Sequence, residues 1–273
     1  MKVAYQGVRG AYSEAALRKH FGKKASPIPL DLSEDVFAAV ETGRADYGIL
    51  PVENTIAGPV AVNADLFWEK SVFATAEVYL GIEHCLLAPQ HSKLEWIKTV
   101  YSHPVALAQC RAFIRGHKLT AVPEYDTAGA AKLVSERNHI SEAAIASVDC
   151  AKAYGLKVLK RGVQSFRNNI TRFLVFTRPA LAPKNLKMQK TSVVFSTRHK
   201  PGELLHCLQQ FADHGINLTR LESRPIPENP FEYIFFVDFL GGLKDKNVAA
   251  ALRRIEKDAH VLKILGSYPL GRR

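Results

Sequence analysis

The segment Thr191-Ser-Val-Val-Phe-Ser-Thr197 decides the fold of the C-terminal part of the chain. Its apolar and polar residues alternate and it is rich in β-branched side chains, which is typical of a strand with one buried face. A helix is predicted next, with Pro201 in its first turn and Gly215 at its end. The apolar residues of this helix, at helical spacing, are Leu204, Leu205, Leu208 and Phe211.

Four further elements follow this helix. Residues 216–226 and 231–240 are predicted strands, residues 248–255 a second amphipathic helix, and residues 260–265 a last strand. The resulting order is βαββαβ, which is the split-βαβ arrangement of ferredoxin-like domains.

Residues 179–190 precede this domain and resemble a linker. They contain two prolines and several cations, and they show no helical or strand period. The sequence therefore predicts a larger domain at residues 1–178, a linker at 179–190 and a smaller domain at 191–273.

Strands and helices alternate in the larger domain, which favours a mostly parallel α/β sheet. Residues 72–88 are extended, and we expect the chain to pass from one lobe to another there, so that a ligand site lies between two lobes. The predicted strands are residues 3–5, 47–52, 98–101, 144–147 and 173–176. The predicted helices are residues 13–21, 33–42, 104–117 and 127–137.

Composition narrows the function classes. The 273 residues are 47% hydrophobic and 23% charged, which are ordinary values for a globular protein, and the net charge of +11 suggests an anionic partner. No apolar run reaches the roughly 20 residues that a membrane helix needs, and the N-terminus lacks the apolar core of a signal peptide. The four cysteines are widely spaced, so we expect buried thiols and a cytoplasmic location rather than disulfides or zinc.

Three polar segments could carry chemistry. Residues 7–13 form a Gly-rich turn before a helix with Ser13 as its expected N-cap, and they predict either an anion site or a plain capped helix. Asn54 and Thr55 follow an apolar strand, and residues 168–172 (Asn-Asn-Ile-Thr-Arg) precede another. These amides, hydroxyls and one guanidinium could bind carboxylates and donate to a leaving oxygen, or they could be ordinary loop chemistry. Neither a serine-hydrolase elbow nor a His-Glu-x-x-His motif is present in the sequence.

The order of these motifs over nearly the whole chain resembles the prephenate dehydratase family, in its stand-alone form with a C-terminal ACT domain. The resemblance implies a two-lobed, periplasmic-binding-protein-like catalytic domain followed by a ferredoxin-like βαββαβ ACT domain. The segments that carry it are Gly7-Val-Arg-Gly-Ala-Tyr-Ser-Glu-Ala-Ala16, Leu50-Pro-Val-Glu-Asn-Thr-Ile-Ala-Gly58, Ser102-His-Pro-Val-Ala-Leu-Ala-Gln-Cys110, Asp126-Thr-Ala-Gly-Ala-Ala131, Ala144-Ile-Ala-Ser147, Asn169-Ile-Thr-Arg-Phe173, Leu221-Glu-Ser-Arg-Pro225 and Leu265-Gly-Ser-Tyr-Pro269.

The family converts prephenate into phenylpyruvate, water and carbon dioxide, a carbon–oxygen lyase reaction of phenylalanine biosynthesis that implies neither a metal nor an organic cofactor. A close relative of the family acts on arogenate and gives phenylalanine directly, and this substrate stays open. By resemblance, Thr171 acts on the leaving hydroxyl, Arg172 binds or orients a carboxylate, and Phe173 packs against the ring. The expected supporting donors are Ser13, Asn54, Thr55, Thr127 and Asn169, and Glu53 is a competing acid if burial raises its pKa.

The resemblance further implies that L-phenylalanine binds the ACT domain as an allosteric inhibitor, and that the chain forms a homo-oligomer, a dimer or a tetramer. Glu203 stands where the family usually has a small residue. The residues expected to bind L-phenylalanine are Gly202, Leu204, Asn217, Leu218, Glu222, Ser223 and Arg224.

Two alternatives to the enzyme remain at this stage. One is a two-lobed sensor that binds a small acid or an amino acid without converting it. The other is a nucleic-acid binder, suggested by the basic residues 157–161, but the sequence has no recognition motif for nucleic acid and we expect no such partner.

Overall fold

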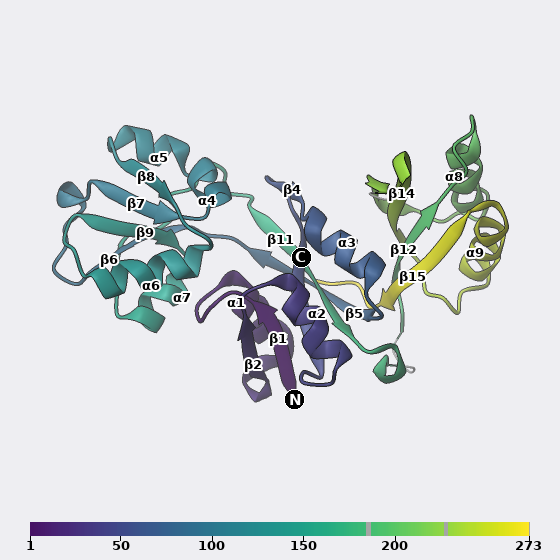
Figure 1. Cartoon of the computed structure of the whole chain (residues 1–273), viewed down its shortest axis with the longest axis horizontal. Helices are drawn as coiled ribbons and strands as arrows, with labels where there is room; N and C mark the ends of the chain where they lie inside the picture. The colour runs from purple at the N-terminus through teal and green to yellow at the C-terminus, as the bar shows by residue number, and fades with distance from the viewer. Residues whose placement is uncertain (184–186, 227–228, 273) are drawn as a thin grey trace. The chain divides into compact units, whose positions relative to one another are not determined.

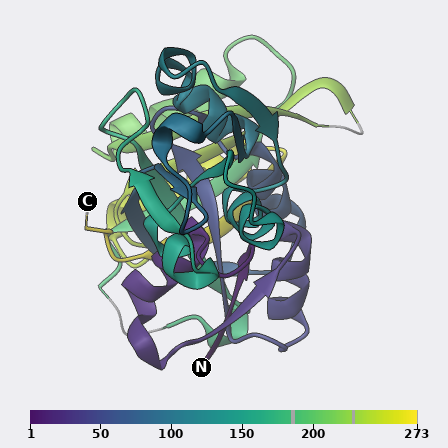
Figure 2. The same cartoon turned by 90° about the vertical axis from the view of Figure 1, so that its left-hand side faces the viewer.

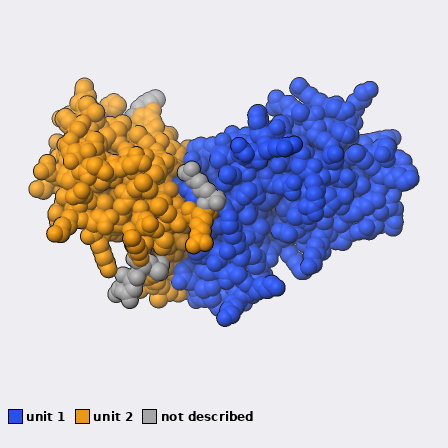
Figure 3. Space-filling view, turned by 180° about the vertical axis from the view of Figure 1, so that it is seen from behind, with its two compact units in different colours: residues 1–60, 78–173, 273 blue, residues 61–77, 174–272 orange. Residues whose placement is uncertain are grey.

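The computed structural model describes residues 1–183, 187–226 and 229–272, which Figure 1 colours from purple at the N-terminus to yellow at the C-terminus. They form two compact units, coloured separately in Figure 3. Unit 1 contains residues 1–60 and 78–173, and unit 2 contains residues 61–77 and 174–272. Residues 184–186 of the predicted linker lie outside the described residues, and the predicted division at 179–190 stays a prediction.

The first lobe of unit 1 is a small α/β layer built around β1. Strand β1 is parallel to both β2 and β3, and the sheet has the order β2-β1-β3-β11, with β4 paired to β3. Helices α1 and α2 pack against β1 and β3. The elements are β1 (Lys2–Gln6), α1 (Tyr12–Phe21), η1 (Gly22–Lys24), β2 (Ser26–Leu30), α2 (Ser33–Glu41), β3 (Tyr47–Asn54), β4 (Gly58–Pro59) and the first half of β11 (Ile170–Thr177).

The core of this lobe follows from its sequence pattern. Val3 and Tyr5 of β1 and Ile49 of β3 are buried, as are Val36 and Phe37 of α2. A parallel strand that is covered by helices is buried on both faces, and it therefore has a nearly continuous apolar sequence.

The second lobe of unit 1 is a mixed sheet with helices packed on it, at the left of Figure 1 and nearest the viewer in Figure 2. The strand order is β10-β6-β9-β7-β8, in which β7 is parallel to β8 and β9, and β6 is antiparallel to β9 and β10. The predicted helix 104–117 is interrupted at Cys110. The elements are β6 (Cys85–Ala88), η2 (Leu94–Trp96), β7 (Thr99–Ser102), α4 (Pro104–Gln109), α5 (Arg111–Gly116), β8 (Thr120–Pro123), α6 (Thr127–Arg137), β9 (Glu142–Ala146), α7 (Val148–Tyr154) and β10 (Lys157–Lys160).

Two extended segments connect the lobes. After β4 the chain forms residues 61–77 of unit 2, and the second half of β5 (Phe73–Gly81) leads into the second lobe at β6; the chain returns to the first lobe between β10 and β11. The backbone N–H of Ile82 donates to the carbonyl of Asn169 at 2.8 Å and so links the two segments. The crossing predicted at residues 72–88 is therefore present, and the two-lobed prediction is confirmed.

Unit 2 contains the βαββαβ order that the sequence predicts. Its strands follow the order β13-β14-β12-β15, and β12 is antiparallel to β14 and to β15, which is the ferredoxin-like topology. Strand β15 also pairs with β5 at Gly266 and Ala74. The elements are α3 (Ala61–Glu69), η3 (Pro179–Leu181), β12 (Lys190–Ser196), α8 (Glu203–Asp213), β13 (Leu218–Ile226), β14 (Asn229–Leu240), α9 (Lys246–Asp258) and β15 (Val261–Tyr268).

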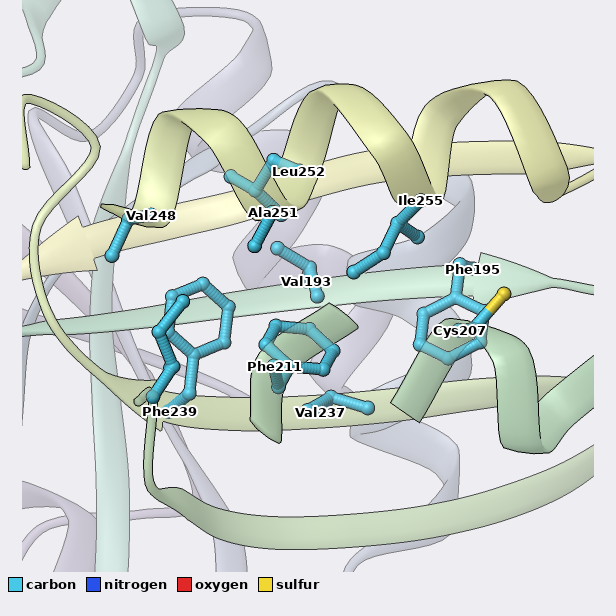
Figure 4. Packing of buried hydrophobic residues seen from close by; sticks show 11 residues of the cluster. Val193, Phe195, Cys207, Phe211, Val237, Phe239, Val248, Ala251, Leu252 and Ile255 are labelled. Carbon is cyan, nitrogen blue, oxygen red and sulfur yellow. The ribbon is translucent and has the colours of Figure 1, made fainter. Parts of the chain in front are cut away.

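Helices α8 and α9 pack against the strands of unit 2 around one apolar core. Phe211 of α8 and Ile255 of α9 meet Val193 and Phe239 of the sheet (Figure 4). The predicted position of Pro201 in the first turn of the helix is wrong, because α8 begins at Glu203 after Gly202 with a left-handed φ of +87°. Leu205 lies on the outer face of α8 and is 63% exposed.

The fold class predicted from the sequence is confirmed, with a two-lobed α/β part and a ferredoxin-like βαββαβ part. Within the described ranges, no helix combines the length and the apolar character needed to span a membrane.

Candidate active site

The loop after β3 fixes the orientation of one amide side chain. Asn54 Oδ1 accepts hydrogen bonds from the backbone N–H groups of Ile56 at 2.9 Å and Ala57 at 2.8 Å. This is an Asx turn, and it leads into the short β4, where Asn54 pairs with Gly58. Because Oδ1 faces two donors that cannot reverse their roles, Nδ2 of Asn54 must point the other way.

Asn54 Nδ2 joins β3 to β11. It donates to Asn169 Oδ1 at 2.7 Å and to Thr171 Oγ1 at 2.9 Å. We call Asn54, Asn169 and Thr171 the amide–hydroxyl cluster. Asn169 is buried and Thr171 is 9% exposed. Since Thr171 Oγ1 accepts from Asn54, its own hydroxyl hydrogen remains available to donate to another group.

Thr55 has a different environment from Thr171. Its hydroxyl donates to the carbonyl of Asn168 at 2.9 Å and accepts from the backbone N–H of Ile170 at 3.0 Å. These bonds hold the loop after β3 against the start of β11. The expected role of Thr55 as a donor to a substrate stays a prediction, because in this structure its hydrogen is directed to the backbone.

Arg172 and Phe173 are the next residues of β11. Alternation along a strand directs Thr171 and Phe173 to one face and Arg172 to the other. Arg172 is 4% exposed and its guanidinium lies 3.7 Å from Glu53 Oε2, while Phe173 is fully buried. The carboxylate of Glu53 is 45% exposed, so it lacks the burial that the competing-acid hypothesis requires.

The turn at residues 7–13 is a packed helix start. The expected N-cap at Ser13 is wrong, because α1 begins at Tyr12 after Ala11, and Ser13 lies inside its first turn. The carboxylate of Glu14 accepts from the backbone N–H of Gly10 at 2.9 Å, and the hydroxyl of Ser147 donates to the Gly10 carbonyl at 2.7 Å. A Cβ atom at Gly10 would lie 3.0 Å from the Cys150 sulfur, and φ there is +88°. The turn is therefore a tightly packed helix start whose N-cap residue, Ala11, makes no side-chain cap bond.

Thr127 is the first residue of α6, after the N-cap Asp126, whose carboxylate accepts from the Gly129 N–H. In the part of the chain that the structure describes, the hydrogen bonds of the amide–hydroxyl cluster do not include Ser13 or Thr127. Their expected substrate contacts stay predictions.

The structure adds a residue that was not selected from the sequence. Asn169 Nδ2 donates to Gln109 Oε1 at 2.8 Å, so the cluster receives a buried side chain from α4 of the second lobe. Gln109 stands in the segment 102–110 that carried part of the resemblance, but nothing in the sequence alone shows that it faces Asn169.

A comparison with protein-family models matches residues 3–180 to the model described as prephenate dehydratase. A curated relative, arogenate dehydratase/prephenate dehydratase 2, chloroplastic, of Arabidopsis thaliana, is 40% identical, and the match covers 99% of this chain and 73% of the relative. The chain belongs to the prephenate dehydratase family. This membership confirms the family and the enzyme class, carbon–oxygen lyase, that the sequence predicts.

Two solved structures are similar to this prephenate dehydratase family member over nearly its whole length. The prephenate dehydratase of Arthrobacter aurescens in complex with L-Phe has a TM-score of 0.90 at 31% identity, covering 98% of this chain and 89% of that one. GqqA, described as a novel type of quorum-quenching acylase, also has a TM-score of 0.90, at 35% identity, covering 99% of this chain and 98% of that one.

The residues expected to bind L-phenylalanine lie in unit 2. Gly202 and Leu204 line a pocket of about 240 Å³, together with Tyr233 and Phe235 of β14. Glu203 lines a different pocket, of about 290 Å³, beside His206 and Lys257.

The other expected regulatory residues lie on or next to the edge strand β13. Asn217 immediately precedes the strand, and Leu218, Glu222, Ser223 and Arg224 belong to it. Glu222 is paired with Arg220, while Arg224 donates two hydrogen bonds to Asp65 of α3, at 3.2 and 2.6 Å. The structure brings Gly202 and Leu204 into one pocket, and two of the strand residues already hold other partners.

No group of three or more His, Cys, Asp or Glu side chains that could hold a metal ion occurs among the described residues. All four cysteines are buried and free. Burial raises the pKa of the Cys110 and Cys150 thiols to about 12.

Proposed function

We propose that this chain is a prephenate dehydratase, which converts prephenate into phenylpyruvate, water and carbon dioxide. The observation that carries the proposal is the hydrogen bond from Asn54 Nδ2 to Thr171 Oγ1, at 2.9 Å, in a member of this family. It leaves the threonine hydroxyl as a donor at a buried position of unit 1.

The chemistry requires a donor at the leaving hydroxyl. The carbon–carboxylate bond breaks and its electron pair enters the ring, the carbon–hydroxyl bond breaks, and the departing hydroxyl takes up a proton from solvent to leave as water. Thr171 donates a hydrogen bond to that oxygen, and the bond it accepts from Asn54 polarises its own O–H group. We assign Phe173, on the same face of β11, the role of packing against the ring.

Arg172 supports the anionic substrate from the other face of β11. Its buried guanidinium is 3.7 Å from Glu53, and a charge in a site of low dielectric acts over several ångströms. We assign Arg172 two roles, electrostatic support of the substrate and the joining of β3 to β11. We assign Ser13, Thr55 and Thr127 supporting roles in substrate binding.

Arogenate is the second candidate substrate, because the Arabidopsis relative has both activities in its name. The two substrates differ only in the side chain, which is a keto acid in prephenate and an amino acid in arogenate. We expect the wild-type chain to turn over prephenate with the higher kcat/KM in a side-by-side assay. Turnover of arogenate alone would replace the proposed substrate, and binding without turnover of either would favour the sensor.

The acylase named for one structural neighbour is not proposed here. An acylase of the nucleophilic type needs an activated hydroxyl or thiol. The buried Ser102 hydroxyl donates to the Ile145 carbonyl at 2.5 Å, and the raised pKa of Cys110 keeps that thiol protonated.

We assign unit 2 the role of an ACT domain that binds L-phenylalanine as an allosteric inhibitor. The pocket beside Gly202 and Leu204 supports this assignment, and Glu203 does not line that pocket. Calorimetry with L-phenylalanine is expected to show binding that weakens in Leu204→Asp, with Glu203→Gln as the matched control. Absence of binding to the wild type would remove the regulatory role.

We also propose that the chain forms a homo-oligomer, a dimer or a tetramer, and that the copies meet at the exposed edge of the sheet of unit 2. Strand β13 ends the strand order, and Leu221 on it is 48% exposed, as expected for a surface that a second copy covers. Light scattering of the purified chain is expected to give at least twice the chain mass of 30.3 kDa. Buried unpaired thiols favour a reducing compartment, for which we propose the cytoplasm.

A further inference from the structure

A chain of buried side chains extends from the amide–hydroxyl cluster to the crossing between the lobes. Gln109 Oε1, which accepts from Asn169, also lies 2.9 Å from Nε2 of His84. His84 Nδ1 lies 3.0 Å from the hydroxyl of Tyr12 on α1. His84 is 3% exposed and Gln109 is 8% exposed, so these groups satisfy one another and not bulk water.

The direction of each bond from Asn54 to His84 follows from the Asx turn at Asn54. The backbone N–H groups of Ile56 and Ala57 fix Asn54 Oδ1 as an acceptor, so Nδ2 donates to Asn169 Oδ1. Asn169 must then donate through Nδ2 to Gln109 Oε1. An amide oxygen cannot donate, so the hydrogen between Gln109 and His84 must reside on Nε2 of the imidazole.

The hydroxyl of Tyr12 lies on the other side of the imidazole. Burial lowers the pKa of His84 and raises that of Tyr12, so the pair is a neutral imidazole and a neutral phenol. With the ring hydrogen on Nε2, Nδ1 can only accept, and it lies 3.0 Å from the hydroxyl of Tyr12, which donates to the Glu83 carbonyl at 2.8 Å. Nε2 therefore has a defined acceptor in Gln109 of the second lobe, and Nδ1 faces the Tyr12 hydroxyl of the first lobe.

The backbone around His84 is fixed as well. Its N–H donates to Gln164 Oε1 at 2.9 Å, and its carbonyl accepts from the Val163 N–H at 3.0 Å. Both partners belong to the second segment that connects the lobes, so the imidazole is held at a set position on the crossing.

Two donors at Gln109 Oε1 determine where the amide nitrogen of this residue points. In the described part of the chain, Gln109 Nε2 has no hydrogen-bond partner, and it is not among the buried side-chain atoms that lack one. It therefore reaches accessible space beside Asn169, with two N–H groups free to donate to an oxygen of a ligand.

We propose that His84 is a positioning residue of this active site, which acts through its Nε2–H to hold the Gln109 side chain with its amide N–H groups toward the substrate. The expected effect of His84 on turnover rests on the proposed function. The position of the imidazole hydrogen on Nε2 rests on the geometry alone. Gln109 is the group that would meet the substrate, and His84 sets the orientation of Gln109.

The first test does not depend on the substrate. Nitrogen-15 NMR of the imidazole in the full wild-type chain is expected to show His84 neutral at pH 7, with its hydrogen on Nε2 and an unprotonated Nδ1. A hydrogen on Nδ1 would reverse the directions given above and overturn the proposal. This result stands or falls separately from whether prephenate is the substrate.

The second test uses two substitutions that separate the ring nitrogens. The amide of Gln can place an N–H near the position of Nε2, whereas that of Asn reaches only the position of Nδ1. We expect His84→Asn to lower kcat about 10- to 100-fold, the size of effect that a small misplacement of a site group produces. His84→Gln is expected to recover most of the activity. Equal losses of kcat in the two variants, at equal melting temperature, would contradict the role of Nε2–H. The matched control is His117→Asn, on the surface of the second lobe.

The third test asks whether His84 acts through Gln109. In a Gln109→Leu background, His84→Asn is expected to cause no further fall in kcat, because the group it positions is already absent. Independent, multiplying losses would show that His84 acts by another route. If His84→Asn does not fold, the NMR assignment and the activity of His84→Gln in both backgrounds decide the question.

Discussion

At the scale of single residues, the site depends on which atom of each amide faces which neighbour. Thr171 can donate to a leaving oxygen because Asn54 donates to it, and Asn54 does so because two backbone N–H groups hold its oxygen. When a hydroxyl oxygen accepts a hydrogen bond in this way, its own O–H group becomes more polarised and is a better donor. In the proposed mechanism, Thr171 is therefore oriented by a loop, and not by an acid or a base.

Asn54→Asp tests this orientation. The aspartate oxygen can still accept from Ile56 and Ala57, so the turn and the fold are expected to survive, but the second oxygen cannot donate to Thr171. We expect kcat to fall about 100-fold, which is the size found when one oriented donor is removed from an active site, while the melting temperature changes little. A variant with normal kcat and an intact fold would show that the donor from Asn54 is dispensable.

At the same scale, the sequence predicted Asn54, Asn169 and Thr171 as site residues, and the structure places them within hydrogen-bond distance. Gln109 could not be predicted, because its contact with Asn169 joins positions 60 residues apart and depends on how the lobes meet. Ser13 was misassigned as an N-cap because a serine after a Gly-rich turn is the usual signal, whereas the N-cap is Ala11, which makes no side-chain cap bond, and Glu14 in the first turn accepts from the Gly10 N–H.

At the scale of elements, strong periodicity predicted the long helices and the inner strands. The edge strand β2 was missed because Pro27 and Pro29 interrupt it, and prolines are tolerated in a sheet only at its edge. The break between α4 and α5 at Cys110 has no sequence signal, since Cys110 continues the apolar face. Helix α3 was also missed, and it belongs to unit 2 with the C-terminal strands.

Lys263 of β15 explains why α3 is held in that unit. Its ammonium donates to the backbone carbonyls of Phe67 at 3.1 Å, Trp68 at 2.5 Å and Lys70 at 2.8 Å, at the C-terminal end of α3. Phe67 and Trp68 belong to the last turn of α3 and Lys70 follows it, so the ammonium lies where a cation interacts favourably with the helix dipole.

Lys263→Met is therefore expected to destabilise the protein. The substitution keeps the apolar stem and removes the ammonium, and we expect a loss of about 1–3 kcal/mol in the free energy of unfolding, because charged hydrogen bonds to buried carbonyls are lost. Thermal unfolding of this variant, compared with that of the exposed Lys257→Met, measures the difference. Equal melting temperatures for the two would remove the capping role.

At the scale of the whole molecule, the sequence predicted two lobes and a ferredoxin-like domain, but not the order of the strands. The crossing at residues 72–88 was visible as a long extended segment, and the βαββαβ order followed from alternating periods. The pairing of β15 with β5 at Gly266 and Ala74 could not be predicted from the sequence, because it requires a close approach of two backbones. A Cβ at Gly266 would overlap the Ala74 carbonyl oxygen.

Burial across the molecule also predicts the behaviour of its thiols. The pKa values of Cys110 and Cys150 are raised to about 12 and that of Cys207 to about 11, so at pH 8 only about one thiol in a thousand or fewer is ionised. We expect a thiol reagent to label the folded chain slowly and to label all four cysteines rapidly after unfolding. A cysteine that reacts within seconds in the folded chain would indicate an exposed thiolate.

The hydroxyl of Thr171 can be tested most directly by steady-state turnover of prephenate in Thr171→Ala and Thr171→Ser. The account predicts that Thr171→Ala lowers kcat by at least about 100-fold with a modest change in KM, because a donor used mainly in the transition state is lost. Thr171→Ser keeps the hydroxyl and is expected to retain most of the activity, with the exposed Thr120→Ala as a control. Near-normal kcat in a folded Thr171→Ala variant would contradict the account.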